Sequence, residues 1–369
     1  WGCSSKKADK TMGDLYLVTG GTGFLGVSIV RSLLKRGSRV RVLARSGDAV
    51  LDKEAGVEIV RGCVTDGACV GRACRGVRGI FHLVGIVEHS RSSEANVRRI
   101  NIEGTVNVVK SAAEHGGIKV VFASTSGTVA VSTSGDAVRG DADGYAEGLV
   151  RGWPYYHSKI VAEVKAREAA GRLNVPLVIL RPSSILGPGE ETLPTKKMLE
   201  YYRTKSIYKH ISSSVPYVPA GGLNFVDVRD VTYAFIAAMD REEATGKDML
   251  LGAPEANMTL GAYFERLEGL SGVKAQTRRV PYALAWVYIA ARQRAAALAG
   301  KTYHVDPVVV EMANCFWYVD PSLARSVLGF EPRPIDQTLT DTLSYIASQG
   351  HAMGLPKGVP PMTIRRAKL

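Results

Sequence analysis

Tyr155 and Lys159 stand four positions apart in this chain. On a helix such residues share a face, so a phenol and an ammonium group would lie one turn from each other. A free phenol has a pKa of about 10, and a neighbouring positive charge lowers that pKa because it stabilises the phenolate. The pair therefore predicts a general acid or base, Tyr155, that exchanges a proton with a carbonyl or alcohol oxygen. The adjacent Tyr156 is not a candidate for this role, because it would not lie on the same helix face as Lys159.

Three consecutive hydroxyl side chains, Ser124, Thr125 and Ser126, end an apolar run that predicts a buried strand at residues 119–124. A hydroxyl at this place would hold the substrate oxygen beside the Tyr155 phenol. Each of these residues also has an ordinary structural explanation, because hydroxyls close turns and cap helices and a tyrosine often packs half-buried on a helix. Their order along the chain favours the active-site interpretation, with Ser124 and Thr125 as the main candidates beside Tyr155.

A glycine-rich turn stands between a predicted strand at residues 14–19 and a predicted helix at residues 24–36. In this pattern the first glycine permits a tight turn, the second lets the backbone approach a pyrophosphate, and the third allows close helix packing. The amides at the start of the helix then face the anion. The turn therefore predicts a dinucleotide site, in which Lys159 would also bond the ribose of the nicotinamide. The residues expected to cradle the pyrophosphate are Gly20, Thr22, Gly23, Phe24, Leu25 and Gly26.

The second predicted strand spans residues 38–44, and the residue that follows it distinguishes a site for NAD(H) from one for NADP(H). A site for NAD(H) usually has an acid there, which bonds the ribose 2'-hydroxyl. This chain has Arg45 at that place, and Asp48 comes later. An arginine binds a 2'-phosphate through charge-assisted hydrogen bonds, whereas a carboxylate repels it. We therefore expect NADP(H) rather than NAD(H); the alternative is that Arg45 is a solvated loop charge.

Strands and helices alternate through the first half of the chain, which predicts an α/β fold of the Rossmann type with a doubly wound parallel sheet. Ligands of such sheets bind outside the carboxyl ends of the strands, so the glycine-rich turn and the hydroxyl cluster should share one edge. Strands are expected at residues 14–19, 38–44, 57–61, 79–84, 119–124 and 176–180, and helices at 24–36, 93–115 and 155–171.

The remaining segments have other compositions. Residues 1–12 form a flexible arm, and residues 13–182 form the nucleotide-binding domain. Residues 183–345 are expected to form a smaller, mainly helical C-terminal substrate lobe, with 224–240 returning to the first domain. Residues 346–369 form a basic, extended tail that is a candidate for contact with a membrane surface or a partner.

Composition excludes several classes of function. The chain has 369 residues, of which 46% are hydrophobic, and a net charge of +12. The positive residues are scattered, which is not typical of a nucleic-acid-binding protein. Five cysteines without a C-x-x-C pair favour a reducing compartment, cytoplasmic or organellar (chloroplast or mitochondrion) after removal of a targeting peptide. The seven histidines have no ligand spacing, so no metal is expected.

Taken together, these motifs resemble the extended short-chain dehydrogenase/reductase family, within the NAD-dependent epimerase/dehydratase superfamily. The likeness is to its dihydroflavonol-4-reductase-like and 3β-hydroxysteroid-dehydrogenase-like members, and it spans residues 14–345. The segments that carry it are residues 19–26, 40–45, 81–85, 101–105, 122–126, 155–159, 180–183 and 224–231.

The resemblance implies further roles for individual residues. Thr125 stands at the usual catalytic hydroxyl, and Asn101 at a structural asparagine of the family. Val84 would line the cofactor, and Pro182 with Ser183 would shield the nicotinamide. The family often has an aspartate that contacts the adenine after its third strand. This chain departs from that pattern, because Cys63 stands there.

Three functions are compatible with the sequence. The first is an NADP(H)-dependent oxidoreductase that acts on a carbonyl or secondary alcohol of a small, apolar substrate. Tyr201, Tyr202, Tyr208 and Tyr217 would line its substrate site or merely pack the lobe. The second is a nucleotide-sugar epimerase or dehydratase with bound NAD. The third is a nucleotide-holding accessory subunit of a membrane-associated complex, suggested by the basic tail and an apolar helix at residues 282–291. A homodimer or larger assembly is left open.

Overall fold

The computed structural model describes residues 13–45, 51–89, 93–189, 220–271, 281–300 and 308–346. The predicted arm at 1–12 lies outside these ranges, as do the four tyrosines between 201 and 217 and nearly all of the tail at 346–369.

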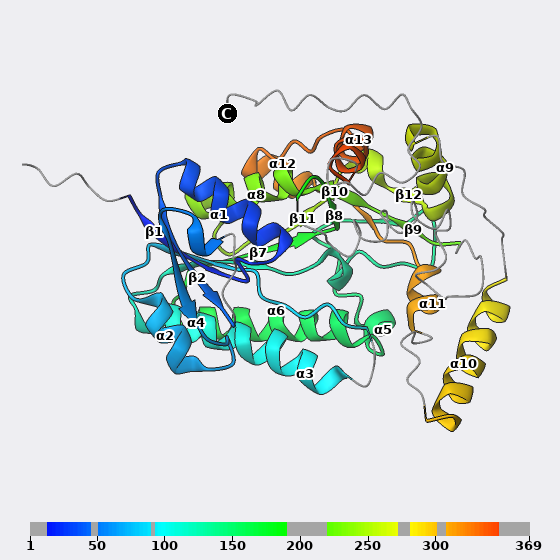
Figure 1. The fold of residues 1–369 in the computed structure, drawn as a ribbon, viewed down its shortest axis with the longest axis horizontal. Coiled ribbons are helices and arrows are strands. Elements are labelled where there is room, and N and C mark those ends of the chain that lie inside the picture. Colours follow the sequence, from blue (N-terminus) through cyan, green and yellow to red (C-terminus); the bar gives the residue numbers. More distant parts are fainter. Residues whose placement is uncertain are drawn as a thin grey trace, which may run out of the picture.

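A seven-stranded parallel sheet forms the centre of the molecule, in the order β11-β7-β5-β4-β1-β2-β3 (Figure 1). The strands are buried on both faces and therefore read as continuous apolar runs rather than alternating ones. The six predicted strands are all confirmed as members of this sheet. Their bounds are β1 Leu15–Thr19, β2 Arg39–Ala44, β3 Val57–Arg61, β4 Gly79–His82, β5 Lys119–Ala123, β7 Leu177–Pro182 and, for the seventh strand, β11 Asp248–Leu251.

Helices cover both faces of the sheet, which confirms the Rossmann-type α/β fold (Figure 1). One hydrophobic core joins the sheet to α1 (Phe24–Lys35), α8 (Val228–Asp240) and α12 (Ser322–Leu328). A second core on the opposite face joins it to α2 (Gly67–Cys74), α4 (Gly104–Glu114) and α6 (Pro154–Leu173). The strand order turns back at β1, which pairs with β2 on one side and β4 on the other. This reversal leaves a crevice at the carboxyl ends of β1 and β4, where ligands of such sheets bind.

The long helix predicted at residues 93–115 is present, but it is not uniform. It consists of α3 (Glu94–Arg98), a π-helical segment at Arg99–Glu103, and α4. Single π-helical turns frequently mark functional sites, because they reorient one side chain within an otherwise regular helix. Here the π-helical turn carries the buried Asn101.

Two elements of this domain were not predicted from the sequence, α2 and the edge strand β11. The four-residue β11 pairs with β7, so the chain returns to the sheet after α8. Its apolar run is only Met249 to Leu251, between Asp248 and Gly252, and three apolar residues do not identify a strand by themselves. The proposed division into a nucleotide domain and a lobe remains a prediction.

The remaining elements are mostly helices, as expected for the C-terminal region, together with three pairs of short strands. The strand pairs are β8 (Ser184–Leu186) with β10 (Phe225–Asp227), β9 (Gly222–Leu223) with β12 (Met258–Thr259), and β6 (Val138–Arg139) with β13 (Tyr318–Val319). The helices are α5 (Glu147–Val150), α9 (Leu260–Ser271), α10 (Tyr282–Leu298), α11 (Val308–Ala313) and α13 (Ile335–Ile346). Short 3-10 turns lie at Leu51–Lys53, Ser126–Thr128, Glu242–Ala244 and Pro254–Ala256.

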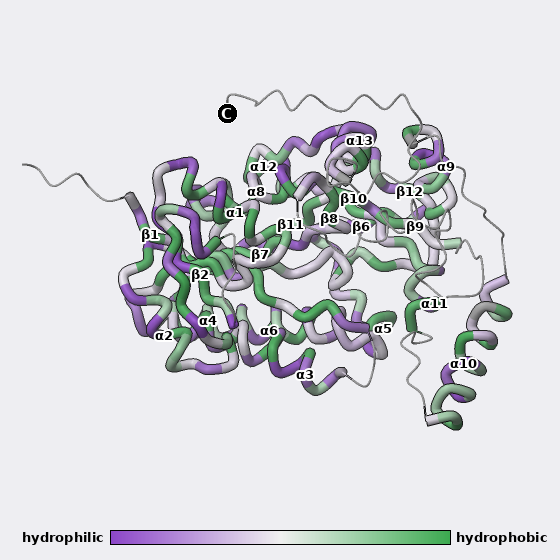
Figure 2. Tube along the Cα trace, in the orientation of Figure 1, coloured by the Kyte–Doolittle hydropathy of each residue, from purple (hydrophilic) through white to green (hydrophobic). Residues whose placement is uncertain are grey.

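Helix α10 differs from the other helices in its exposed apolar side chains. Leu284 is 61% exposed and Val287 58%, and Tyr282 and Trp286 are also exposed. Figure 2 shows hydrophobic residues along this helix, which lies at the periphery of the molecule. Among the described helices, none combines the length and apolar character needed to cross a bilayer.

Candidate functional site

The glycine-rich turn after β1 has the geometry that the sequence predicted for a pyrophosphate cradle. Gly20 has a φ of +74°, a conformation that favours glycine, and a Cβ there would lie 3.0 Å from the backbone nitrogen of Val84. A Cβ on Gly26 would lie 2.1 Å from the carbonyl oxygen of Gly20. The missing side chain therefore lets α1 pack directly on the turn. Gly23 caps the N-terminus of α1, which directs the first helix amides toward the crevice.

A pocket opens at the carboxyl ends of β1 to β4. Arg45 and Val84 line it together with part of the glycine-rich turn, as the sequence predicted. Phe24, Leu25 and Gly26, which the sequence also predicted for the cradle, are not among its lining residues, and Leu25 packs against the core. No carboxylate is present among the described residues of the wall. The full lining is Gly20, Thr22, Gly23, Leu43, Ala44, Arg45, Gly62, Cys63, Val64, Leu83, Val84, Gly85, Ile86 and Ile100.

Cys63 occupies the part of the pocket wall that follows β3. Its thiol accepts a hydrogen bond from the Thr65 hydroxyl at 3.1 Å. Burial opposes ionisation of the thiol, but the Thr65 hydrogen bonds and the charges of Arg45 and Arg99 outweigh it, so the pKa of Cys63 is lowered. The electrostatics of this end of the pocket are therefore positive, with Arg45 exposed at the mouth.

The Tyr155 hydroxyl lies inside the protein, at the start of α6, and interacts with the Thr125 side chain. The tyrosine is only 8% exposed. Burial raises its pKa to about 12, and the Thr125 hydrogen bond opposes that rise. The sequence predicted a lowered pKa, which is wrong for this structure because burial dominates. Tyr156 packs instead against the Trp317 ring, with centroids 4.8 Å apart.

Lys159 lies one turn further along α6, fully within the core. Its Nζ donates a hydrogen bond to the carbonyl oxygen of Ala123 at 2.8 Å and lies 4.8 Å from the centroid of the Phe122 ring. Burial lowers the pKa of Lys159 to about 8, and the charge of Glu163 opposes the fall. The amine also approaches the pocket, because a Cβ on Gly85 would lie 3.1 Å from it.

The hydroxyl of Ser124 is not directed toward Tyr155. It donates a short hydrogen bond to the Glu163 carboxylate, two helical turns along α6 from Tyr155. Thr125 is the N-cap of the 3-10 turn at Ser126–Thr128, and its Oγ1 accepts a hydrogen bond from the Gly127 amide at 3.3 Å. The structure therefore narrows the candidates for a substrate-holding hydroxyl to Thr125, with Ser124 in a structural role.

Asn101 fastens the pocket wall to the catalytic helix. Its Oδ1 accepts a hydrogen bond from the Ile86 amide at 2.8 Å, and its Nδ2 donates one to the Ser158 hydroxyl at 2.9 Å. Ser158 in turn donates to the Tyr155 carbonyl oxygen at 2.6 Å. This chain of bonds explains why a buried asparagine occupies the π-helical segment.

Pro182 and Ser183 end β7 beside β5. Both are buried, and the Ser183 hydroxyl donates to Oδ1 of Asn224 at 2.7 Å. They do not form part of the pocket wall described above. Their predicted contact with the nicotinamide remains a prediction.

Sequence reasoning missed the buried charges around Glu163. This residue follows Lys159 by one helical turn and pairs with Arg181 of β7. The signal was available, because an acid on the buried face of a helix and an arginine within an apolar strand each need a partner. Among the described residues, no group of three or more His, Cys, Asp or Glu side chains is arranged to hold a metal ion.

The cradle and pocket fit a nicotinamide dinucleotide. The close approach of backbone at Gly20 and the helix amides at Gly23 suit a pyrophosphate, and the pocket wall continues to Gly85, beneath which the Lys159 amine lies. The arrangement places a phenol, a hydroxyl and an amine at the same sheet edge as the pocket. Such groups can orient a carbonyl and deliver a proton to it.

Comparisons with known proteins agree with this geometry. The model of the NAD dependent epimerase/dehydratase family matches residues 16–252. Cinnamoyl-CoA reductase 1 of Oryza sativa subsp. japonica is 31% identical over 251 residues, which cover 64% of this chain and 71% of that protein. The 3 beta-hydroxysteroid dehydrogenase type 7 of Homo sapiens is 34% identical over 208 residues, 51% of this chain and 53% of that protein.

A solved structure shares the fold. MoeE5 in complex with UDP-glucuronic acid and NAD matches with a TM-score of 0.70 at 20% identity, covering 91% of this chain and 100% of that one.

Proposed function

Because the chain belongs to the NAD-dependent epimerase/dehydratase family, we propose that it transfers hydride between NADP(H) and the carbonyl or secondary alcohol of a small, apolar substrate. At the coarser level it is an oxidoreductase of this family that uses a nicotinamide dinucleotide. The observation that carries the proposal is the buried pairing of the Tyr155 hydroxyl with Thr125, at the edge of the sheet where the pocket opens.

The chain's own residues then act on the substrate oxygen. When bound, the dinucleotide supplies or accepts the hydride. Tyr155 donates its proton to the oxygen as negative charge develops there, and Thr125 holds that oxygen by a hydrogen bond. Lys159, as a cation, stabilises the phenolate that remains. A pKa of about 12 keeps Tyr155 protonated at neutral pH, which suits proton donation and thus the reductive direction.

The preference for NADP(H) is supported by Arg45 at the pocket mouth and by the lack of a carboxylate among the described residues of the wall. The positive influence of Arg45 and Arg99 on Cys63 agrees with a site for an additional phosphate. NAD is the dinucleotide in the MoeE5 complex, so direct measurement of both Kd values decides the question for this chain. A Kd for NADPH at least tenfold below that for NADH supports the proposal, and a preference for NADH contradicts it.

A nucleotide-sugar epimerase or dehydratase is the second candidate, because MoeE5, which shares the fold, forms a complex with UDP-glucuronic acid and NAD. The two functions differ in what happens to the cofactor. A reductase consumes NADPH in proportion to a ketone substrate, whereas an epimerase converts a UDP-sugar without net change in the dinucleotide. Incubation of the protein with each substrate class, followed at 340 nm and by chromatography of the sugar, separates them.

A membrane-surface contact is a further part of the proposal, and helix α10 is the observation that favours it. Its exposed residues Leu284, Trp286 and Val287 combine aliphatic and aromatic side chains, and exposed apolar side chains of this kind mark contacts with membranes or partners. Residues 269–305 contain six Lys or Arg residues and no Asp or Glu. Apolar exposure beside unbalanced positive charge favours an anionic bilayer surface as the partner, rather than a second copy of this equally basic chain.

A further inference from the structure

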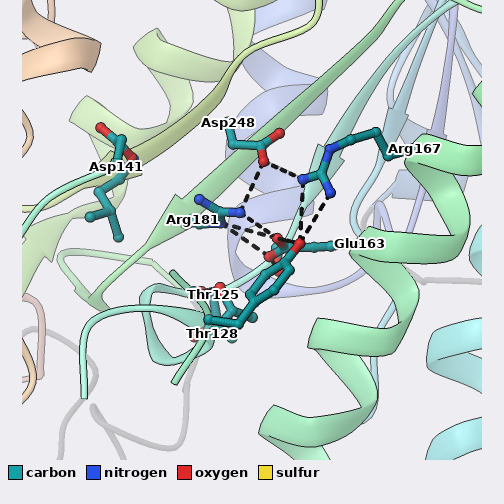
Figure 3. Close-up of polar contacts among 10 residues, drawn as sticks. Thr125, Thr128, Asp141, Glu163, Arg167, Arg181 and Asp248 are labelled. Carbon is teal, nitrogen blue, oxygen red and sulfur yellow. Dashed lines mark hydrogen bonds and ion pairs between the residues drawn. The ribbon is translucent and has the colours of Figure 1, made fainter. Parts of the chain in front are cut away.

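A cluster of charged side chains, drawn in Figure 3, lies one helical turn beyond Lys159 on α6, and the proposed chemistry does not use it. Its centre is Glu163 of α6, which is completely buried, paired with Arg181 of β7. Arg181 Nε lies 3.2 and 3.1 Å from the two carboxylate oxygens, and its Nη2 lies 2.6 Å from one of them. Such a fork fixes the carboxylate in both position and orientation.

Further bonds hold the cluster from neighbouring elements. Ser124, directly after β5, and Tyr145 donate to the Glu163 carboxylate, the tyrosine at 3.0 Å. Asp248 of β11 accepts from Arg181 at 3.0 Å and from Arg167, as Figure 3 shows for these three residues. The two carboxylates and two guanidinium groups balance in charge.

Stability alone does not explain the arrangement. A buried ion pair contributes little compared with well-packed apolar residues, because desolvation offsets most of the attraction. Glu163, however, lies four residues after Lys159 on the same buried face of α6. In a dry interior the charge of one group acts strongly on the other.

We propose that Glu163 is a positioning residue for Lys159: its fixed carboxylate keeps the Lys159 amine in the cationic form that supports Tyr155. The inference rests on the proposed function only in assigning Lys159 a cationic role. Glu163, rather than Arg181 of β7, is the member of the cluster that shares the buried face of α6 with Lys159, and its charge opposes the fall in the pKa of Lys159 that burial causes.

The other groups that face Lys159 do not supply this charge. His82 of β4 is neutral, because burial and the charge of Lys159 lower its pKa to about 3. Phe122 and Ala123 of β5 offer a ring and a carbonyl oxygen, and Tyr155 is protonated at neutral pH.

Helix α5 and the π-helical segment also pack on α6. Among the described residues they contribute one ion pair with this helix and one neutral amide. On α5, Glu147 lies 3.9 Å from His157 in an exposed contact. From the π-helical segment, Asn101 contributes a neutral amide.

The test is an NMR titration of protein labelled with [ε-13C]lysine, with the Lys159 signal assigned by its loss in Lys159→Met. In the wild type this signal should titrate with a midpoint at about 8. Glu163→Gln should lower the midpoint by about one pH unit or more, because an opposite charge has been removed. Glu163→Asp, which keeps the charge, should stay closer to the wild type. Asp248→Asn is the matched control: it removes another carboxylate from Arg181 but should leave the midpoint unchanged.

An unchanged midpoint in Glu163→Gln overturns the proposal, and so does an equal fall in Asp248→Asn. If Glu163→Gln does not fold, the double variant Glu163→Gln with Arg181→Met removes the whole pair and should still lower the midpoint. The basic limb of the pH profile of kcat/KM should move in parallel. The titration needs no turnover, so failure of the wild type to reduce any carbonyl would refute the proposed function without touching this inference.

Discussion

Replacement of Lys159 by methionine should stabilise the protein while abolishing its activity. The lysine is buried as a cation, and its pKa falls from an ordinary value of 10.5 to about 8. At about 1.4 kcal/mol per pH unit, that difference corresponds to about 3 kcal/mol of destabilisation at pH 7. The variant also loses the hydrogen bond to the Ala123 carbonyl oxygen, which costs it about 1 kcal/mol. Its free energy of unfolding at pH 7 should therefore be about 2 kcal/mol higher than that of the wild type.

The difference in stability between the wild type and Lys159→Met should depend on pH. A depressed pKa means that the unfolded chain binds more protons than the folded chain between pH 8 and 10.5. The free energy of unfolding of the wild type should therefore rise relative to that of the variant as pH increases through that window. Below pH 7 the difference between the two free energies should be constant.

Urea denaturation at pH 6, 7, 8, 9 and 10 measures both effects through the midpoint at constant m value. A Lys159→Met protein that is less stable than the wild type by a similar amount at every pH would refute the reasoning. Such a result would mean that the ammonium group is a net stabiliser and that its burial carries no penalty.

Three further perturbations test other parts of the structure. Arg45→Ala should weaken NADPH binding by about tenfold or more and leave NADH binding almost unchanged, as measured by fluorescence titration, since a guanidinium–phosphate contact contributes about 1.5–3 kcal/mol; equal losses for both cofactors would contradict the assignment. Gly26→Ala should lower the free energy of unfolding by about 1–3 kcal/mol because backbone must move, whereas Gly171→Ala in α6, where a Cβ meets open space, should be neutral or stabilising in the same urea assay. Leu284→Asp with Val287→Asp should abolish co-sedimentation with vesicles containing phosphatidylserine; if the wild type does not bind them and instead dimerises through this helix, the membrane proposal is wrong.

Much of the sheet and the cradle was predictable because their signals are local. Buried parallel strands have long apolar runs, and Gly20 and Gly26 have a spacing that few other structures require. The family likeness read from these motifs is confirmed. The short edge strand β11 was not predictable, because its pairing with β7 depends on a chain return from α8 that no local pattern encodes.

The details of the site depended on packing. Ser124 and Thr125 follow β5 directly, and both contact α6, but the Ser124 hydroxyl bonds Glu163 whereas the Thr125 side chain bonds Tyr155. The pKa of Tyr155 was predicted in the wrong direction for a related reason. Tyr155 and Lys159 do lie one turn apart on α6, but burial of the phenol outweighs the Thr125 hydrogen bond, and a sequence does not show the depth of burial.

The rate of NADPH oxidation with a panel of apolar ketones, compared between the wild type and Tyr155→Phe, tests the central claim most directly. Removal of the proton donor should lower kcat by about 100-fold or more, while the Kd for NADPH stays within about twofold because the ring and its packing are kept. A Tyr155→Phe protein that reduces the same ketones at the wild-type rate would contradict the account.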